Sequence, residues 1–206
     1  MAMLKALVWK TLSVSATGKR LVILQRLAPY LSTVGWFKSI FEGLPVDAKG
    51  KPLPWYTYPF ICFVSERIQP NMRVFEYGSG NSTLWWSKRV SSVVAVEHDE
   101  QWFKAMSQKM SSNVSYKYCE LEYAGEYCNL ISSFFSEFDC IVIDGRDRVN
   151  CAKNALSALK ENGVIIWDNS DRHSYQDGYT FLLEKGFRRI DFWGLGPINR
   201  YPWCTS

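Results

Sequence analysis

One stretch decides the fold: Val74-Phe75-Glu76-Tyr77-Gly78-Ser79-Gly80-Asn81-Ser82-Thr83. An apolar run carries an acidic residue, Glu76, near its end and is followed by two glycines, Gly78 and Gly80. Glycines at this spacing let the chain turn sharply after a strand and bring backbone N–H groups close to a ligand. Ser82 or Thr83 can then cap a helix. The stretch therefore predicts a strand, a ligand-binding loop and a helix in succession.

The chain on both sides of this stretch alternates between apolar strand-like runs and helical segments. Helical spacing begins at Pro59, and a second helical segment is expected at 175–184. Strands alternating with helices are typical of an α/β fold. We expect a Rossmann-like, doubly wound, mostly parallel sheet with helices on both faces, and a last strand that begins at 201–206 and is truncated. The other expected strands are 73–77, 92–97, 114–119, 139–144, 163–167 and 185–193.

A second acidic residue indicates the kind of ligand. Glu97 ends the next predicted strand, 19 positions after Gly78, and a carboxylate at that place accepts hydrogen bonds from ribose hydroxyls. Glu76 disfavours a pyrophosphate, and a nicotinamide dinucleotide site would have glycine where Thr83 stands. The pair of carboxylates favours a nucleoside with positive charge.

These residues resemble motif I and the following acidic motif of class I S-adenosylmethionine-dependent methyltransferases, over residues 59–194. Ser82 is a departure, because many members have a third glycine there. The resemblance implies the class I methyltransferase fold, S-adenosylmethionine as cofactor, Glu76 near its methionyl part and Glu97 on its ribose. The expected cofactor-binding residues are Glu76, Gly78, Ser79, Gly80, Asn81, Glu97, His98 and Asp144.

Two further strands end in oxygen donors: Asp144 follows one, and Asp168 with Asn169 follows the other. Neighbouring strand ends share one crevice, where these oxygens suit Mg²⁺. The pattern is similar to that of catechol-type small-molecule O-methyltransferases, and the resemblance implies that all three residues bind a divalent metal that acidifies the substrate hydroxyl. The alternative stays open that Asp144 contacts cofactor or substrate directly and that Asp168 and Asn169 only cap a helix.

The candidate catalytic residues are Asp144, Arg146 and His173. Catechol-type enzymes have a lysine base just after the first of these aspartates, where this chain has arginines. Arg146 stays protonated and cannot be a base, but it can bind an acidic substrate group together with Arg148. His173 is a candidate base in its place. Aromatic side chains, among them Tyr56 and Trp102, are candidates to stack adenine or line the acceptor site.

The N-terminal part differs in charge from the rest. Six lysines and arginines precede the first acidic residue, Glu42, in a chain of 206 residues and net charge +4. We expect a basic helical extension and linker at 1–58, with two short helices broken at Pro29 and able to act as a lid, and a methyltransferase domain at 59–206. The extension either packs on the domain or contacts an anionic membrane surface. Six cysteines without metal-like spacing, and no apolar run long enough to span a bilayer, favour a cytoplasmic protein with reduced, buried thiols.

The sequence thus predicts an O-directed methyltransferase for a small-molecule or carbohydrate-like acceptor, with metal assistance left open. The alternative is a catalytically degenerate methyltransferase fold that binds cofactor or a partner. Nucleic acid is not an expected partner, because residues 42–206 carry a slight negative charge. A homo-oligomer is compatible with the sequence.

Overall fold

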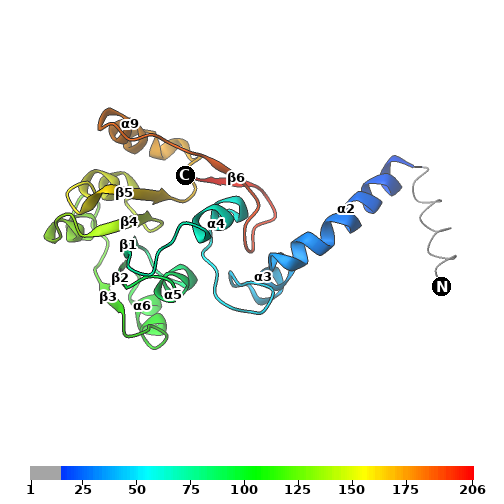
Figure 1. The fold of residues 1–206 in the computed structure, drawn as a ribbon, viewed down its shortest axis with the longest axis horizontal. Coiled ribbons are helices and arrows are strands. Elements are labelled where there is room, and N and C mark those ends of the chain that lie inside the picture. The colour runs from blue at the N-terminus through cyan, green and yellow to red at the C-terminus, as the bar shows by residue number, and fades with distance from the viewer. Residues whose placement is uncertain (1–14) are drawn as a thin grey trace.

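The computed structural model describes residues 15–206, so Lys5 and Lys10 of the predicted basic extension lie outside the described residues. Its centre is a parallel five-stranded sheet in the order β3-β2-β1-β4-β5 (Figure 1). This confirms the predicted α/β class and five of the predicted strands. The strands are β1 (Arg73–Tyr77), β2 (Ser92–Glu97), β3 (Val114–Tyr118), β4 (Phe138–Ile143) and β5 (Leu159–Trp167).

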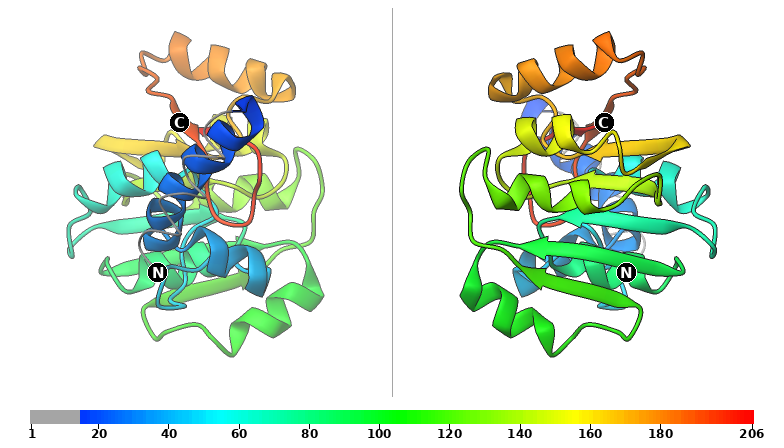
Figure 2. Two further views of the ribbon diagram at one scale, coloured as in Figure 1. Left: turned by 90° about the vertical axis from the view of Figure 1, so that its right-hand side faces the viewer. Right: turned by 90° about the vertical axis from the view of Figure 1, so that its left-hand side faces the viewer.

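Alternate side chains of the strands build two apolar cores, one on each face of the sheet. Phe75 and Tyr77 of β1 belong to one core, whereas Val74 belongs to the other. The first core packs against α7, α8 and α9, and the second against α4 and α5, so helices cover both faces as Figure 2 shows. The helices are α4 (Tyr58–Ser65), α5 (Asn81–Ser87), α6 (Glu100–Ser107), α7 (Glu126–Asn129), η1 (Leu130–Ser133), α8 (Arg148–Asn154), η2 (His173–Tyr175) and α9 (Gln176–Glu184).

A two-stranded antiparallel ribbon of β6 (Phe192–Gly194) and β7 (Trp203–Thr205) follows α9. The predicted strand at 185–193 is therefore wrong over most of its length. The predicted last strand is present as β7. Ser206, the residue after β7, exchanges backbone hydrogen bonds of 2.8 and 2.9 Å with Trp167 at the end of β5. This short ribbon supplies side chains to the strand ends of the main sheet.

The N-terminal part forms one long helix and one short helix. The long helix is α2 (Ala16–Thr33), which passes through Pro29, so the predicted break at that proline is wrong. It projects away from the sheet, and α3 (Trp36–Glu42) lies at its base (Figure 1). A linker without helix or named strand joins α3 to α4, as predicted from its prolines and glycines.

No helix within residues 15–206 is long and apolar enough to cross a membrane. Five of the six cysteines are buried free thiols in the apolar interior, whereas Cys62 is exposed. The expectation of buried thiols is therefore wrong for Cys62, which lies on the solvent side of α4.

Candidate functional site

A cavity of about 200 Å³ lies at the carboxyl ends of β1, β2 and β4. Ligands of open α/β sheets bind at this edge, where the connections that follow two neighbouring strands run to opposite faces of the sheet. Five of the eight predicted cofactor-binding residues are in its wall, which is formed by Gly78, Ser79, Glu97, His98, Asp144, Gly145 and Arg146. A larger hollow of about 330 Å³ lies at the other end of α5, against the linker, away from these strand ends.

Two glycines let the β1 and β4 loops approach each other. Gly78 has a φ of +91°, which favours glycine, and a Cβ on it would lie 3.1 Å from the backbone of Gly145. A Cβ on Gly145 would in turn lie 2.1 Å from the Tyr127 hydroxyl. Side chains larger than hydrogen at these two positions would push the two loops apart and open the floor of the cavity.

Glu97 organises the loops around the cavity. Its Oε1 accepts backbone hydrogen bonds from His98 and Asp99 at 2.9 and 3.0 Å, and its Oε2 accepts one from the Ser79 hydroxyl at 2.6 Å. Ser79 also shares a 2.7 Å hydrogen bond with the Tyr116 hydroxyl. A carboxylate has about four lone-pair sites, so Glu97 retains capacity for ligand hydroxyls.

Glu76 lies under the loop and is not part of the cavity wall, being only 1% exposed. The Thr83 hydroxyl donates to its Oε2 at 2.5 Å, while its Oε1 is buried without a hydrogen-bond partner. Burial raises the pKa of Glu76 to about 8, and the negative charges of Asp144 and Glu97 act in the same direction. A positively charged ligand nearby would favour the ionised form of Glu76 and so lower this pKa.

Arg148 connects the ends of β4 and β5. Its side chain is 6% exposed, donates to the carbonyl oxygens of Gly145, Asp144 and Asp168, and lies 3.0 Å from Asp144 Oδ1. Burial raises the pKa of the Asp144 carboxyl, and the charge of Arg148 opposes that rise. Asp144 thus has one oxygen bound to a fixed cation while its side chain stays partly open to the cavity.

Asp168 faces the short ribbon. Its Oδ1 accepts hydrogen bonds from Trp203 Nε1 at 2.9 Å and from the Thr205 hydroxyl at 2.7 Å. Burial, followed by the charge of Asp144, raises the pKa of Asp168 to about 7. Asp168 therefore ties β5 to β7 rather than presenting a free carboxylate to the cavity.

These residues do not fit a divalent metal ion. The guanidinium of Arg148 already binds Asp144 Oδ1 and the main-chain carbonyl of Asp168, and its charge would repel a second cation. Within residues 15–206 no group of three His, Cys, Asp or Glu side chains is placed to hold a metal. Asn169 is half-buried with a φ of +50° and has no side-chain bond to either aspartate.

The remaining predicted site residues are dispersed. Asn81 donates to the carbonyl of Pro45 at 2.7 Å and so holds the linker, and Gly80 precedes α5 outside the cavity wall. Arg146 is exposed at the cavity, whereas His173 is exposed in η2 and is not in the cavity wall. The structure therefore brings Arg146 to the cavity and leaves His173 off it.

Several residues of the site were not predicted from sequence in their observed roles. Trp102 Nε1 donates to the carbonyl of Ser79 at 3.0 Å and covers the glycine loop. Tyr56 is fully buried, and its high pKa reflects burial together with the nearby charges of Glu76 and Asp144. Arg148, expected beside Arg146 on the substrate side, points inward instead.

No known family model matches the sequence, and no curated protein matches it. Among solved structures, precorrin 8w decarboxylase from Methanobacterium thermoautotrophicum is 16% identical with a TM-score of 0.55, over 80% of this chain and 95% of that one. Precorrin-6y C5,15-methyltransferase from Geobacter metallireducens is 14% identical with a TM-score of 0.55, over 71% and 84%. A methyltransferase-like protein from Silicibacter pomeroyi is 17% identical with a TM-score of 0.52, over 75% and 88%.

The chain has the Rossmann-like methyltransferase fold. At such identities the likeness concerns the fold alone, and the chemistry has to be argued from the cavity. The sheet order β3-β2-β1-β4-β5 places the cavity at the point where the order reverses, as expected for this architecture.

Proposed function

We propose that this protein is an S-adenosylmethionine-dependent methyltransferase that acts on a hydroxyl of a small-molecule or carbohydrate-like acceptor. The observation that carries the proposal is the cavity at the ends of β1, β2 and β4, with Glu97 and Asp144 in its wall and Glu76 buried beside it. Three carboxylates around one small cavity favour a cationic ligand.

The cofactor supplies an electrophilic methyl group on a positively charged sulfur. Glu97 offers its remaining lone pairs to the ribose hydroxyls, and the exposed backbone of Gly78 and Ser79 lets the ligand approach closely. Glu76 has an unpartnered Oε1 and a pKa of about 8 without ligand. Binding of the cationic cofactor favours its ionised form, which then places negative charge under the loop. Trp102 packs over the same loop and is our candidate for contact with the adenine.

On the acceptor side, Asp144 is our candidate proton acceptor. Its pKa is raised, so its carboxylate is more basic than that of an ordinary aspartate, and Arg148 holds it in one orientation. A bound cofactor would supply its methyl group to the acceptor oxygen and leave as S-adenosylhomocysteine, and Asp144 would accept the proton of the acceptor hydroxyl. Arg146, exposed at the cavity, binds an acidic group of the acceptor.

The proposed reaction does not use a metal ion. Arg148 provides the positive charge beside the Asp144 carboxylate and binds the main-chain carbonyl of Asp168. The linker between α3 and α4 approaches the same acidic residues. Asn81 donates to the carbonyl of Pro45 in the linker, and Tyr56 lies buried near the charges of Glu76 and Asp144. We propose that this linker forms a wall of the acceptor site.

The test measures formation of S-adenosylhomocysteine by the full chain with a panel of hydroxyl acceptors, including carbohydrates. We expect turnover with at least one acceptor, equal rates with EDTA and with Mg²⁺, and loss of turnover in Asp144→Asn with cofactor binding retained. Arg146→Met is the matched control and should raise KM for acidic acceptors without abolishing turnover. Cofactor binding without turnover on any acceptor would favour a degenerate binding module, and absence of binding would overturn the proposal.

A further inference from the structure

The projecting helix α2 exposes an apolar face. Ile23, Leu24 and Leu27 are 58%, 59% and 48% exposed, and Tyr30 is 55% exposed. Residues three, four and seven positions apart lie on one side of an α-helix, so these four side chains and Leu31 form one stripe. An apolar stripe of this length facing water is normally covered by something.

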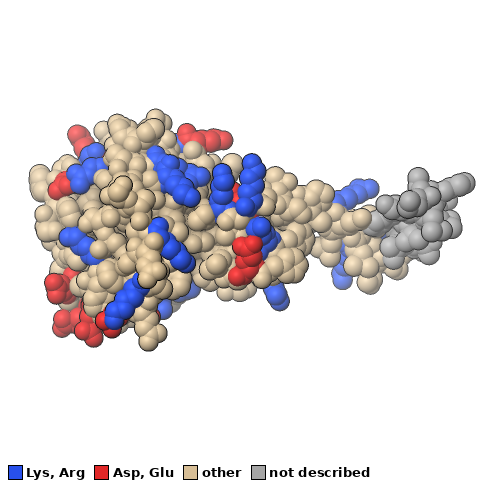
Figure 3. All heavy atoms as spheres, turned by 90° about the horizontal axis from the view of Figure 1, so that it is seen from below, with Lys and Arg blue, Asp and Glu red and all other residues tan. Residues whose placement is uncertain are grey.

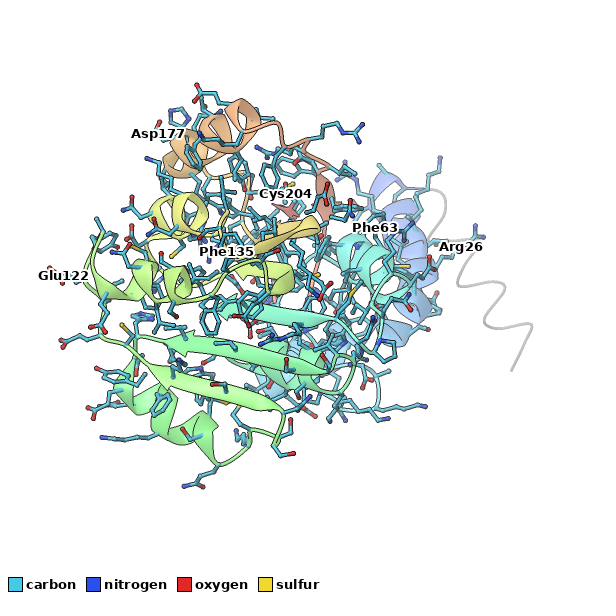
Figure 4. The ribbon with its side chains drawn as sticks, turned by 60° about the vertical axis from the view of Figure 1, so that its left-hand side comes forward. Arg26, Phe63, Glu122, Phe135, Asp177 and Cys204 are labelled. Atoms are coloured by element: carbon cyan, nitrogen blue, oxygen red, sulfur yellow. The ribbon has the colours of Figure 1, made fainter. Side chains whose placement is uncertain are left out.

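The same helix is strongly basic. Lys19 and Arg26, seven positions apart, lie along one border of the stripe. Arg20 lies on the same side as Ile23, Leu24 and Leu27, and its side chain is long enough to carry the guanidinium beyond the apolar stripe. The first acidic residue of the chain is Glu42, and on the face in Figure 3 the projecting part shows blue but no red side chains. Arg26 extends from α2 away from the domain in Figure 4.

The charge decides what covers the stripe. Residues 1–41 carry six positive charges and no negative one, while the remaining residues carry a net charge of −2 within the total of +4. A second copy would bring two such segments together and repel. A nucleic acid would satisfy the charges but leave Ile23, Leu24 and Leu27 in water. A bilayer with anionic headgroups satisfies both features.

We propose that α2 lies in the headgroup region of an anionic lipid bilayer, with Ile23, Leu24, Leu27 and Tyr30 toward the acyl chains and Lys19 and Arg26 among the headgroups. The helix then anchors the methyltransferase domain peripherally. This inference does not depend on the proposed catalytic activity.

The test is flotation of the full chain with vesicles of phosphatidylcholine alone or with added phosphatidylglycerol. We expect binding only to the anionic vesicles and a decrease at high salt. The variant L24S/L27S and the variant K19E/R26E should each bind about tenfold more weakly. Leu183→Ser, which removes an apolar side chain of similar exposure on α9, is the matched control and should bind normally.

Equal melting temperatures of the variants show that they are folded. Equal binding to neutral and anionic vesicles, or no binding to either, would overturn the proposal. It would also be overturned by sedimentation that detects a dimer abolished in L24S/L27S, which would assign the stripe to a second copy. Salt-sensitive binding of nucleic acid without vesicle binding would likewise contradict it.

Discussion

Glu97 accepts hydrogen bonds from three donors in the two loops that enclose the cavity. We therefore expect Glu97 to contribute strongly to cofactor affinity. Glu97→Ala should abolish binding of S-adenosylmethionine, because both the ribose contact and the position of Ser79 are lost. Asp168→Ala should retain binding, since that side chain faces Trp203 and Thr205. Isothermal calorimetry on both variants measures this, and Glu97→Ala with unchanged affinity would contradict the assignment.

Glu76 makes stability depend on pH. Burial raises its pKa from about 4.5 in the unfolded chain to about 8, so the folded state binds the proton more tightly. Its contribution to the free energy of unfolding is full below pH 4.5, decreases as the pH rises through 8 and is constant above that. Glu76→Gln should be less sensitive to pH over this window, as measured by denaturant unfolding. Parallel curves for wild type and variant would show that Glu76 does not titrate in this range.

The sequence predicted which residues line the cavity better than it predicted which groups the side chains around the cavity contact. Gly78, Ser79, Glu97 and Asp144 were found because a strand end and a glycine turn fix where their backbone lies. The direction of Arg148 could not be predicted, because it depends on α8 starting at that residue and turning the side chain beneath the end of β4.

At the scale of elements, Arg148 joins β4 to β5, and its removal should destabilise the fold. Arg148→Met leaves Asp144 buried without its cation and should lower the free energy of unfolding by about 3 kcal/mol. Asp144→Asn in the same chain should recover part of that loss, because the uncompensated charge disappears. Arg146→Met, at the exposed neighbouring arginine, should change stability by about 0.5 kcal/mol or less. Denaturant unfolding of the wild type and the three variants decides, and an Arg148→Met variant as stable as the wild type would contradict this role.

The strands β1, β2 and β4 could be predicted because each is a mostly buried apolar run, and the edge strands β3 and β5, whose side chains are partly exposed, pair with them. The segment 185–191 has strand-like residues but forms no strand, since Ile190 is 62% exposed and Arg189 is held by Asp191 and the carbonyl of Ser170. Its neighbour β7 has only three residues and pairs no farther. Strand propensity without a partner strand does not make a sheet.

At the scale of the whole molecule, α3 and the linker are hydrogen-bonded to the rest of the chain, whereas α2 projects away from the sheet (Figure 1). The buried Ser39 hydroxyl donates to the carbonyl of Val46 at 2.8 Å and accepts from its N–H at 3.0 Å, and Trp36 Nε1 donates to the carbonyl of Asn199 at 2.9 Å. These bonds connect α3 to the linker and to the loop before β7. We therefore propose a division near residue 34 within the described residues, and the boundary at 58 stays a prediction.

Two changes test this division. Deletion of residues 1–33 should leave the melting temperature and cofactor affinity unchanged, because α2 projects into solvent (Figure 1). Ser39→Ala should lower the free energy of unfolding by about 1–3 kcal/mol, since both polar groups of Val46 would be left buried without a partner. Thermal unfolding with and without cofactor measures both. A large loss of stability on deletion would mean that α2 belongs to the folded core, and its apolar stripe would then need a partner within the chain.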